Sequence, residues 1–163
     1  MLKHYLLLAA LLPLAAASAQ DIPKVCAKKM KRTVDIEGVT TIHTKLKDTR
    51  FALVWKTIKQ GEETTSLLLE TRHPSRDYDD SGALVLLEDG TRLEFETGPV
   101  WRGTMSYGSW EYSAFCELTD EQIEILASSP IKQFRLGPSF DGYPTPANAT
   151  LVQQQMGCIN LMH

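Results

Sequence analysis

Alternating hydrophobic and polar positions run through the middle of the chain and predict β-strands. Short alternations of Val, Ile and Thr around Gly38 predict a hairpin or two short strands over residues 32–47. A further strand is predicted over 51–59, and the segment 64–72 is its expected partner after a turn at 60–62. Strands joined by such short turns pair antiparallel.

Asp89-Gly90 predicts a second hairpin, because this dipeptide separates strand patterns at 84–88 and 92–96. A two-residue type I′ turn requires positive φ at both central residues, which Asp and Gly tolerate best. Two more strands are expected, within 107–118 and over 131–136.

Two helices are expected in the last third of the chain. Thr119-Asp120-Glu121-Gln122 matches a capping box and predicts a short helix over 120–128, which ends before Pro130. A Gly/Pro-rich loop at 137–146 closes with Thr-Pro, a pair that suits the cap and first turn of a helix near 146–161.

This order of elements predicts an α+β fold. About seven or eight strands and two late helices, without βα alternation, favour a mainly antiparallel sheet that is curved or two-layered and covered by the carboxyl-terminal helix. The 163 residues, 43% hydrophobic and 23% charged, suit one globular domain and exclude a disordered chain. A net charge of -3 has the wrong sign for a general nucleic-acid binder.

The amino terminus has the layout of an export signal. Lys3 precedes an almost wholly apolar stretch over 6–17, and Ala17-Ser18-Ala19 is a small-x-small pattern after which cleavage is expected. The stretch is too short for a transmembrane anchor, and no later segment is long and apolar enough to span a bilayer. We therefore expect a signal peptide over 1–19 and a single exported domain over 20–163, periplasmic or secreted.

Three cysteines remain in the exported chain. Because their number is odd and exported proteins meet an oxidising compartment, at most one internal bridge is expected. Cys116 alternates with Trp110 and Tyr112 on the apolar face of a strand, where a thiol is inert. We predict a Cys26–Cys158 disulfide and a free Cys116. The spacings lack the CxxC pairs of zinc or redox sites.

The segment 77–88 matches a calcium-loop template. Such loops carry oxygen ligands at positions 1, 3 and 5, Gly at 6 and Glu at 12, and the corresponding ligand residues are Asp77, Asp79, Ser81 and Glu88. Pro74 and Asp89-Gly90 disfavour the two helices that flank these loops. A solvated acidic loop is therefore preferred, and Ca²⁺ is the single cofactor kept as an alternative.

Exposed aromatic side chains are candidate binding residues. Trp101 and Tyr143 lie near Gly or Pro, where loops and edge strands expose side chains, with Arg102 and Asp141 as polar neighbours. Trp110 and Tyr112 share a face with Ala114 and Cys116 and are expected in the core instead.

Neighbouring carboxylates suggest a small hydrolase as an alternative. The pairs are Glu62/Glu63, Asp79/Asp80 and Glu94/Glu96, with His73 near the acidic loop. Acid pairs are common on exposed strands, and no GxSxG, P-loop, HExxH or GxGxxG motif occurs.

Four segments have a familiar order, namely 87–95 (LEDGTRLEF), 115–123 (FCELTDEQI), 130–136 (PIKQFRL) and 157–159 (GCI). In this order the chain resembles small, uncharacterised exported proteins of Bacteroidetes-type bacteria, over about half of the exported part. The resemblance implies a location in the bacterial envelope and transfers no catalytic residue.

Together these observations predict an exported, non-enzymatic binding or accessory domain of the bacterial envelope, with an envelope protein or a glycan as its partner. A small envelope hydrolase that uses carboxylates or His73 is one alternative. A calcium-stabilised adhesion or glycan-binding module is the other.

Overall fold

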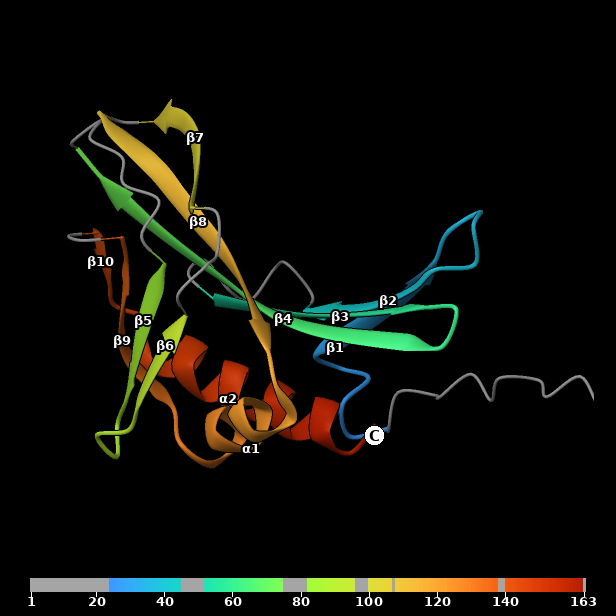
Figure 1. The fold of residues 1–163 in the computed structure, drawn as a ribbon. Helices are drawn as coiled ribbons and strands as arrows, with labels where there is room; N and C mark the ends of the chain where they lie inside the picture. Colours follow the sequence, from blue (N-terminus) through green and yellow to red (C-terminus); the bar gives the residue numbers. More distant parts are fainter. Residues whose placement is uncertain are drawn as a thin grey trace, which may run out of the picture.

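Two antiparallel sheets and two helices make up the structure (Figure 1). The computed structural model describes residues 24–44, 52–74, 82–95, 100–106, 108–137 and 140–162. The expected signal peptide lies outside these residues. No helix within the described ranges is long and apolar enough to cross a membrane.

The larger sheet has six strands in the order β1-β2-β3-β4-β8-β7. Its strands are β1 (Met30–Val34), β2 (Thr40–Thr44), β3 (Ala52–Lys59), β4 (Glu62–His73), β7 (Val100–Ser106) and β8 (Ser109–Leu118). The long strands β4 and β8 form its centre, since β3 pairs with residues 62–69 of β4 and β8 pairs with residues 65–73. Because strands twist, the sheet carries β1 and β2 to one side of the molecule and β7 to the other (Figure 1).

The smaller sheet has four strands in the order β10-β9-β5-β6. They are β5 (Ala83–Leu87), β6 (Arg92–Phe95), β9 (Ile131–Leu136) and β10 (Phe140–Gly142). One face of this sheet is buried, and its edge strand β10 packs on the larger sheet. There the Phe140 ring stacks on Tyr112 of β8, with ring centroids 4.1 Å apart.

Both predicted helices are confirmed. They are α1 (Asp120–Ser128) and α2 (Pro146–Asn160). The Gln122 N–H donates to the Thr119 hydroxyl and the Thr119 N–H donates to the Gln122 amide oxygen, which completes the capping box. Thr145 caps α2, and α2 ends one residue earlier than predicted, with Leu161 as its C-cap.

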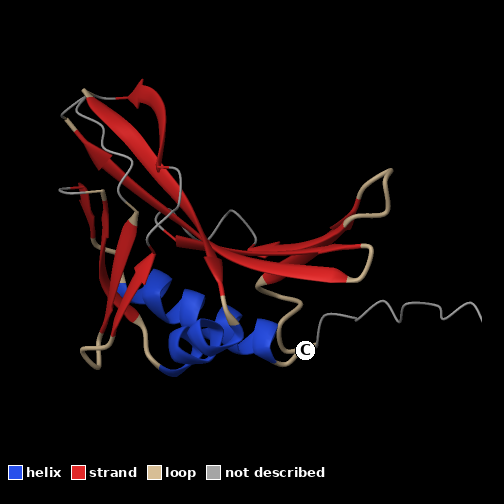
Figure 2. Cartoon of the chain, in the orientation of Figure 1, coloured by secondary structure: helices blue, strands red, loops and turns tan. Residues whose placement is uncertain are grey.

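The helices lie side by side under the two sheets (Figure 2). Helix α2 contacts β3 of the larger sheet and β9 of the smaller one, and its Val152, Met156 and Ile159 side chains are buried. Burial of each such side chain contributes about 1.5 to 3 kcal/mol. A single hydrophobic cluster therefore joins residues of both sheets and both helices.

The α+β class and the antiparallel sheets are confirmed, with two or three more strands than predicted. The sequence predicts seven or eight strands, whereas the described residues form ten. The additional strands are β7 and β10, which are both at sheet edges. Strand β10 has three residues and lies in the predicted Gly/Pro-rich loop. Its extended conformation depends on packing against other strands, which local pattern does not contain.

The hairpin at Asp89-Gly90 is confirmed, but the predicted type I′ turn is wrong. Only Gly90 has a positive φ, of 91°, and its N–H donates to the Leu87 carbonyl at 3.1 Å. This is a type I turn closed by a left-handed glycine, which makes a three-residue loop. Positive φ at both central residues occurs instead at Gln60 (53°) and Gly61 (87°), between β3 and β4.

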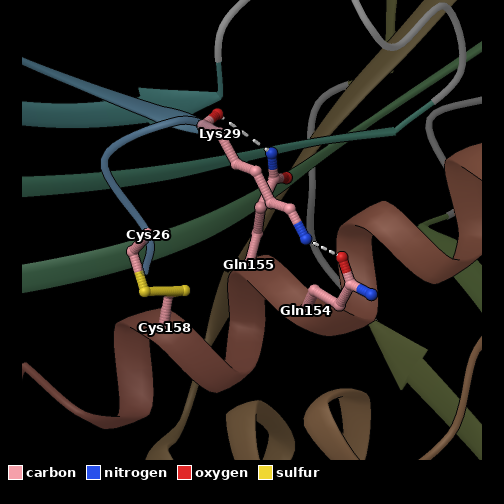
Figure 3. The surroundings of a disulfide bond; sticks show 5 residues. All are labelled: Cys26, Lys29, Gln154, Gln155 and Cys158. Atoms are coloured by element: carbon pink, nitrogen blue, oxygen red, sulfur yellow. Dashed lines mark hydrogen bonds between the residues drawn. A yellow bond between two sulfur atoms is a disulfide. The ribbon is translucent and has the colours of Figure 1, made fainter. Parts of the chain in front are cut away.

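A disulfide joins the first described segment to the last helix. Cys26 and Cys158 are bonded, as predicted, and their Cα atoms are 5.9 Å apart (Figure 3). Cys116 is a free, buried thiol, also as predicted. The bridge spans 132 residues of sequence and therefore removes much of the freedom of the unfolded chain.

The buried Gln155 amide reinforces this connection. Its Nε2 donates to the Lys29 carbonyl at 3.3 Å, and its Oε1 accepts from the Thr44 hydroxyl at 2.8 Å. The Lys29 ammonium donates in turn to the Gln154 side chain (Figure 3). One α2 side chain thus connects the segment before β1 with the end of β2.

We expect removal of the disulfide to lower the free energy of unfolding by about 5 kcal/mol, because the closed loop is long. The double variant Cys26→Ser/Cys158→Ser should show this loss in urea unfolding, whereas Cys116→Ala should cost much less. In the native protein, denatured without reductant, alkylation should modify one thiol, and after reduction three. Three modified thiols without reductant would contradict the bridge.

Candidate functional site

The outer side of the smaller sheet is the site most suited to binding. Along β5, Ala83, Val85 and Leu87 are buried, while the alternate residues Leu84 and Leu86 remain half-buried on the other side. We call this side the open face. Its residues are Leu84, Leu86, Arg92, Glu94, Gln133, Arg135, Asp141 and Tyr143.

Strand register arranges the open face in two rows. In the first row Leu86 of β5 lies between Arg92 of β6 and Gln133 of β9. Directly opposed side chains have Cβ atoms only about 5 Å apart, so the polar residues flank the leucine closely.

In the second row Leu84 lies between Glu94 and Arg135, and Asp141 of β10 follows Arg135. The two leucines are successive outward residues of the same strand. They form an apolar strip in the middle of the sheet, and polar side chains stand on both sides of it.

A hollow of about 300 Å³ lies over this strip. Its lining consists of Leu84, Leu86, Arg92, Gln133, Phe134, Arg135 and Asp141. This volume is at the lower end of the range of small-molecule sites, and the combination of an apolar floor with a few polar groups is typical of them.

Arg135 and Asp141 form an ion pair at one end of the hollow. Arg135 Nε donates to Asp141 Oδ1 at 2.7 Å and Nη2 donates to Oδ2 at 3.4 Å. The hydrogen bond and the charge of Asp141 raise the pKa of Arg135 above its usual value. The Arg135 guanidinium is therefore permanently charged and is already paired with the Asp141 carboxylate.

Strand β10 places Asp141 and Tyr143 at the edge of the open face. Gly142 lies against the Phe134 ring so closely that an added Cβ would overlap the ring. The Thr71 hydroxyl of β4 donates to the Asp141 carbonyl at 2.9 Å. The position of this edge is thus set by contacts with both β9 and β4.

Of the two predicted aromatic binding residues, the structure brings Tyr143 to the open face. Its side chain is 64% exposed, and Gln133 Nε2 donates to its hydroxyl at 3.1 Å. Trp101 belongs to β7 of the larger sheet, and its side chain lies outside the described ones. The two residues therefore belong to different sheets.

Leu84, Leu86, Arg92 and Gln133 were not singled out by sequence. The signal for Leu84, Leu86 and Arg92 is the outward half of the strand alternations at 84–88 and 92–96, and Gln133 lies in the strand predicted over 131–136. That pattern gives each strand an outer side, but it does not show that β9 pairs with β5.

The calcium template stays a prediction. Asp77, Asp79 and Ser81 lie outside the described residues, and Glu88 is exposed in the turn after β5. Five strand residues at about 3.3 Å each separate Glu88 from Gly82, where the template requires the chain to fold back. Within the described ranges, no three His, Cys, Asp or Glu side chains are grouped to hold a metal.

The described carboxylates of the predicted pairs do not face each other. Glu62 and Glu63 are successive strand residues and therefore point to opposite sides of β4. Glu63 Oε2 lies 2.6 Å from Nζ of Lys56, whose side chain is fully buried. Asp79, Asp80 and Glu96 are outside the described residues.

The two described histidines, His43 and His73, and the free Cys116 thiol are packed among other residues. The His73 ring lies 5.0 Å from the Phe140 ring, and His43 stacks on Trp55 at 5.1 Å. Burial raises the pKa of the Cys116 thiol to about 12, so this cysteine stays protonated at neutral pH.

Glu70, on the outer side of the larger sheet, has a perturbed carboxyl group that sequence did not indicate. Partial burial raises its pKa, the negative charge of Glu111 raises it further, and Arg72 opposes the rise. Arg72 also pairs with Glu111 at 3.5 Å. The perturbation arises from the pairing of β4 with β8.

No protein-family model, curated protein or solved structure matches this chain.

We expect Gly142→Ala to destabilise the protein by about 1 to 3 kcal/mol, because the new methyl group would overlap the Phe134 ring. Gly157→Ala is the matched control. It lies within α2 with nothing within 4 Å of the added Cβ, and should stabilise by about 0.5 to 1 kcal/mol. Urea unfolding measures both, and equal effects would contradict the packing of β10.

Glu63→Gln should lower the free energy of unfolding by roughly 1 to 3 kcal/mol, because it leaves the buried Lys56 ammonium without its counter-charge. Glu62→Gln, at the neighbouring exposed position, should change it by less than about 0.5 kcal/mol. Similar losses in the two variants would show that the ion pair does not stabilise the fold.

Proposed function

We propose that the protein is an exported, non-enzymatic binding or accessory domain of the bacterial envelope, which acts in the periplasm or outside the cell. We assign the binding role to the hollow on the open face, because its apolar floor on β5 meets polar groups from three other strands, β6, β9 and β10. An envelope protein or a glycan is the partner that we favour, since the exposed Tyr143 ring at the rim suits contact with either.

Export is supported by two independent features. The apolar stretch and small-x-small pattern at residues 1–19 match the signals that direct secretion. The Cys26–Cys158 bridge is of a kind that persists in oxidising compartments. The resemblance to exported proteins of Bacteroidetes-type bacteria agrees with both.

The positions of the titratable groups favour binding over catalysis. Glu63 is engaged with Lys56, His73 packs on Phe140, and the thiol of Cys116 has a high pKa. An acid–base or nucleophilic site needs such groups directed at one substrate position.

We expect the mature protein, immobilised, to retain a component of envelope extracts through the open face. Leu84→Ser/Leu86→Ser should lose that retention at least tenfold, because it removes the apolar floor. Phe115→Ser is the matched control, since Phe115 is an exposed apolar residue on the outer side of the larger sheet. Full-length protein expressed in a bacterial host should be exported and begin at Gln20.

Two results would overturn the proposal. One is hydrolase turnover that a point mutation in the open face or at Glu70 abolishes. The other is retention that Phe115→Ser reduces and Leu84→Ser/Leu86→Ser leaves intact.

A further inference from the structure

The two arginines of the open face differ in their partners. Asp141 binds the Arg135 guanidinium through two hydrogen bonds. No ion pair or hydrogen bond holds the Arg92 guanidinium among the residues that the structure describes. Arg92 is exposed, directly opposite Leu86, and lines the same hollow. The hollow therefore has one neutralised cation and one available cation.

The available cation lies beside an apolar surface. Across Leu86 from Arg92 stands Gln133, whose amide donates to the Tyr143 hydroxyl. From β6 to β10, a ligand would thus meet a guanidinium, then a leucine strip, then an amide and a phenol. Guanidinium groups bind carboxylates through two parallel hydrogen bonds, and apolar groups gain by covering leucine.

We propose that the hollow binds a small amphipathic anion, with its anionic group on Arg92 and its apolar body over Leu84 and Leu86. This inference rests on the proposed binding function and names the chemistry of the group that enters the hollow, whether a free small ligand or a part of the envelope partner supplies it. A volume of about 300 Å³ suits a compact aromatic or short aliphatic acid. A polar group at the far end of the ligand would reach Gln133 or Tyr143.

Glu94 weakens the preference of the hollow for an anionic ligand. It is exposed on the same side of β6 as Arg92 and opposite Leu84, and it does not line the hollow. Its negative charge weakens the attraction of an anion to Arg92 through water. Glu94→Gln should therefore tighten the binding of an anion a few-fold and leave that of a neutral ligand unchanged.

Two fluorescent probes that share one apolar body test the inference. They are 8-anilinonaphthalene-1-sulfonate, which is an anion, and the neutral N-phenyl-1-naphthylamine. We expect the anion to bind at least tenfold more tightly to the mature protein, and Arg92→Gln to remove that difference. Arg72→Gln is the control, because Arg72 is an exposed arginine on the outer side of the larger sheet.

The site of binding is read from backbone amide shifts. The anionic probe should shift the amides of Leu84, Leu86 and Gln133, and Leu86→Asp should weaken both probes. Equal affinity for the two probes would overturn the inference, as would a preference that Arg92→Gln leaves intact or shifts confined to the larger sheet.

The retention experiment on envelope extracts distinguishes failure of this inference from failure of the proposed binding function. If Leu84→Ser/Leu86→Ser abolishes retention but Arg92→Gln does not, the binding face stands and the anionic ligand is wrong. If neither variant affects retention, both proposals fail. Loss of retention in both variants, with Arg72→Gln unaffected, supports both.

Discussion

The connection between the amino-terminal segment and α2 is the constraint on which the larger sheet depends. Strand β1 is an edge strand, and the described part of the chain supports it on one side by β2 alone. The disulfide fixes the segment before β1 to α2, and the buried Gln155 amide fixes the end of β2 to the same helix. The apolar contacts of the β1–β2 hairpin are confined to its base, where Met30 and Ile42 are buried, since its tip residues Val34 and Ile36 are exposed.

The smaller sheet depends on the pairing of two hairpins that are distant in sequence. Its hairpin of β5 and β6 and its hairpin of β9 and β10 come from separate parts of the chain, with β7, β8 and α1 between them. They meet where β9 pairs with β5, and the Glu88 N–H adds a bond to the Pro130 carbonyl at 3.0 Å. The open face therefore depends on the pairing of β5 with β9, and α2 packs against β9.

Much of the fold could be predicted from the local sequence pattern. The capping box at Thr119, the Thr-Pro start of α2 and the buried side of β8 were predictable, because each depends on neighbouring residues alone. The Cys26–Cys158 bridge could be predicted, since burial of Cys116 left two other cysteines.

The remaining features depend on contacts between distant segments. Strand β10 becomes extended because Phe140 stacks on Tyr112, and Glu70 has a raised pKa because the sheet partly buries it and β8 brings Glu111 beside it. The open face also depends on contacts between distant segments. Tyr143 could be chosen by its Gly/Pro neighbourhood, but its partner Gln133 and the leucine strip follow only from sheet order.

Packing within the sheet accounts for the covering of the open-face leucines but not for the Arg92 guanidinium beside them, which is unpaired within the described part of the chain. Leucine on the solvent side of a sheet can be covered by the methylene stem of an opposing arginine, and Arg92 is in position to cover Leu86. Such a contact would use the stem and leave the guanidinium in solvent. It would also restrict the side chain before any ligand arrives, which lowers the entropy cost of binding. The register that sets Arg92 opposite Leu86 thus places both an arginine stem beside the leucine and an available cation at the hollow.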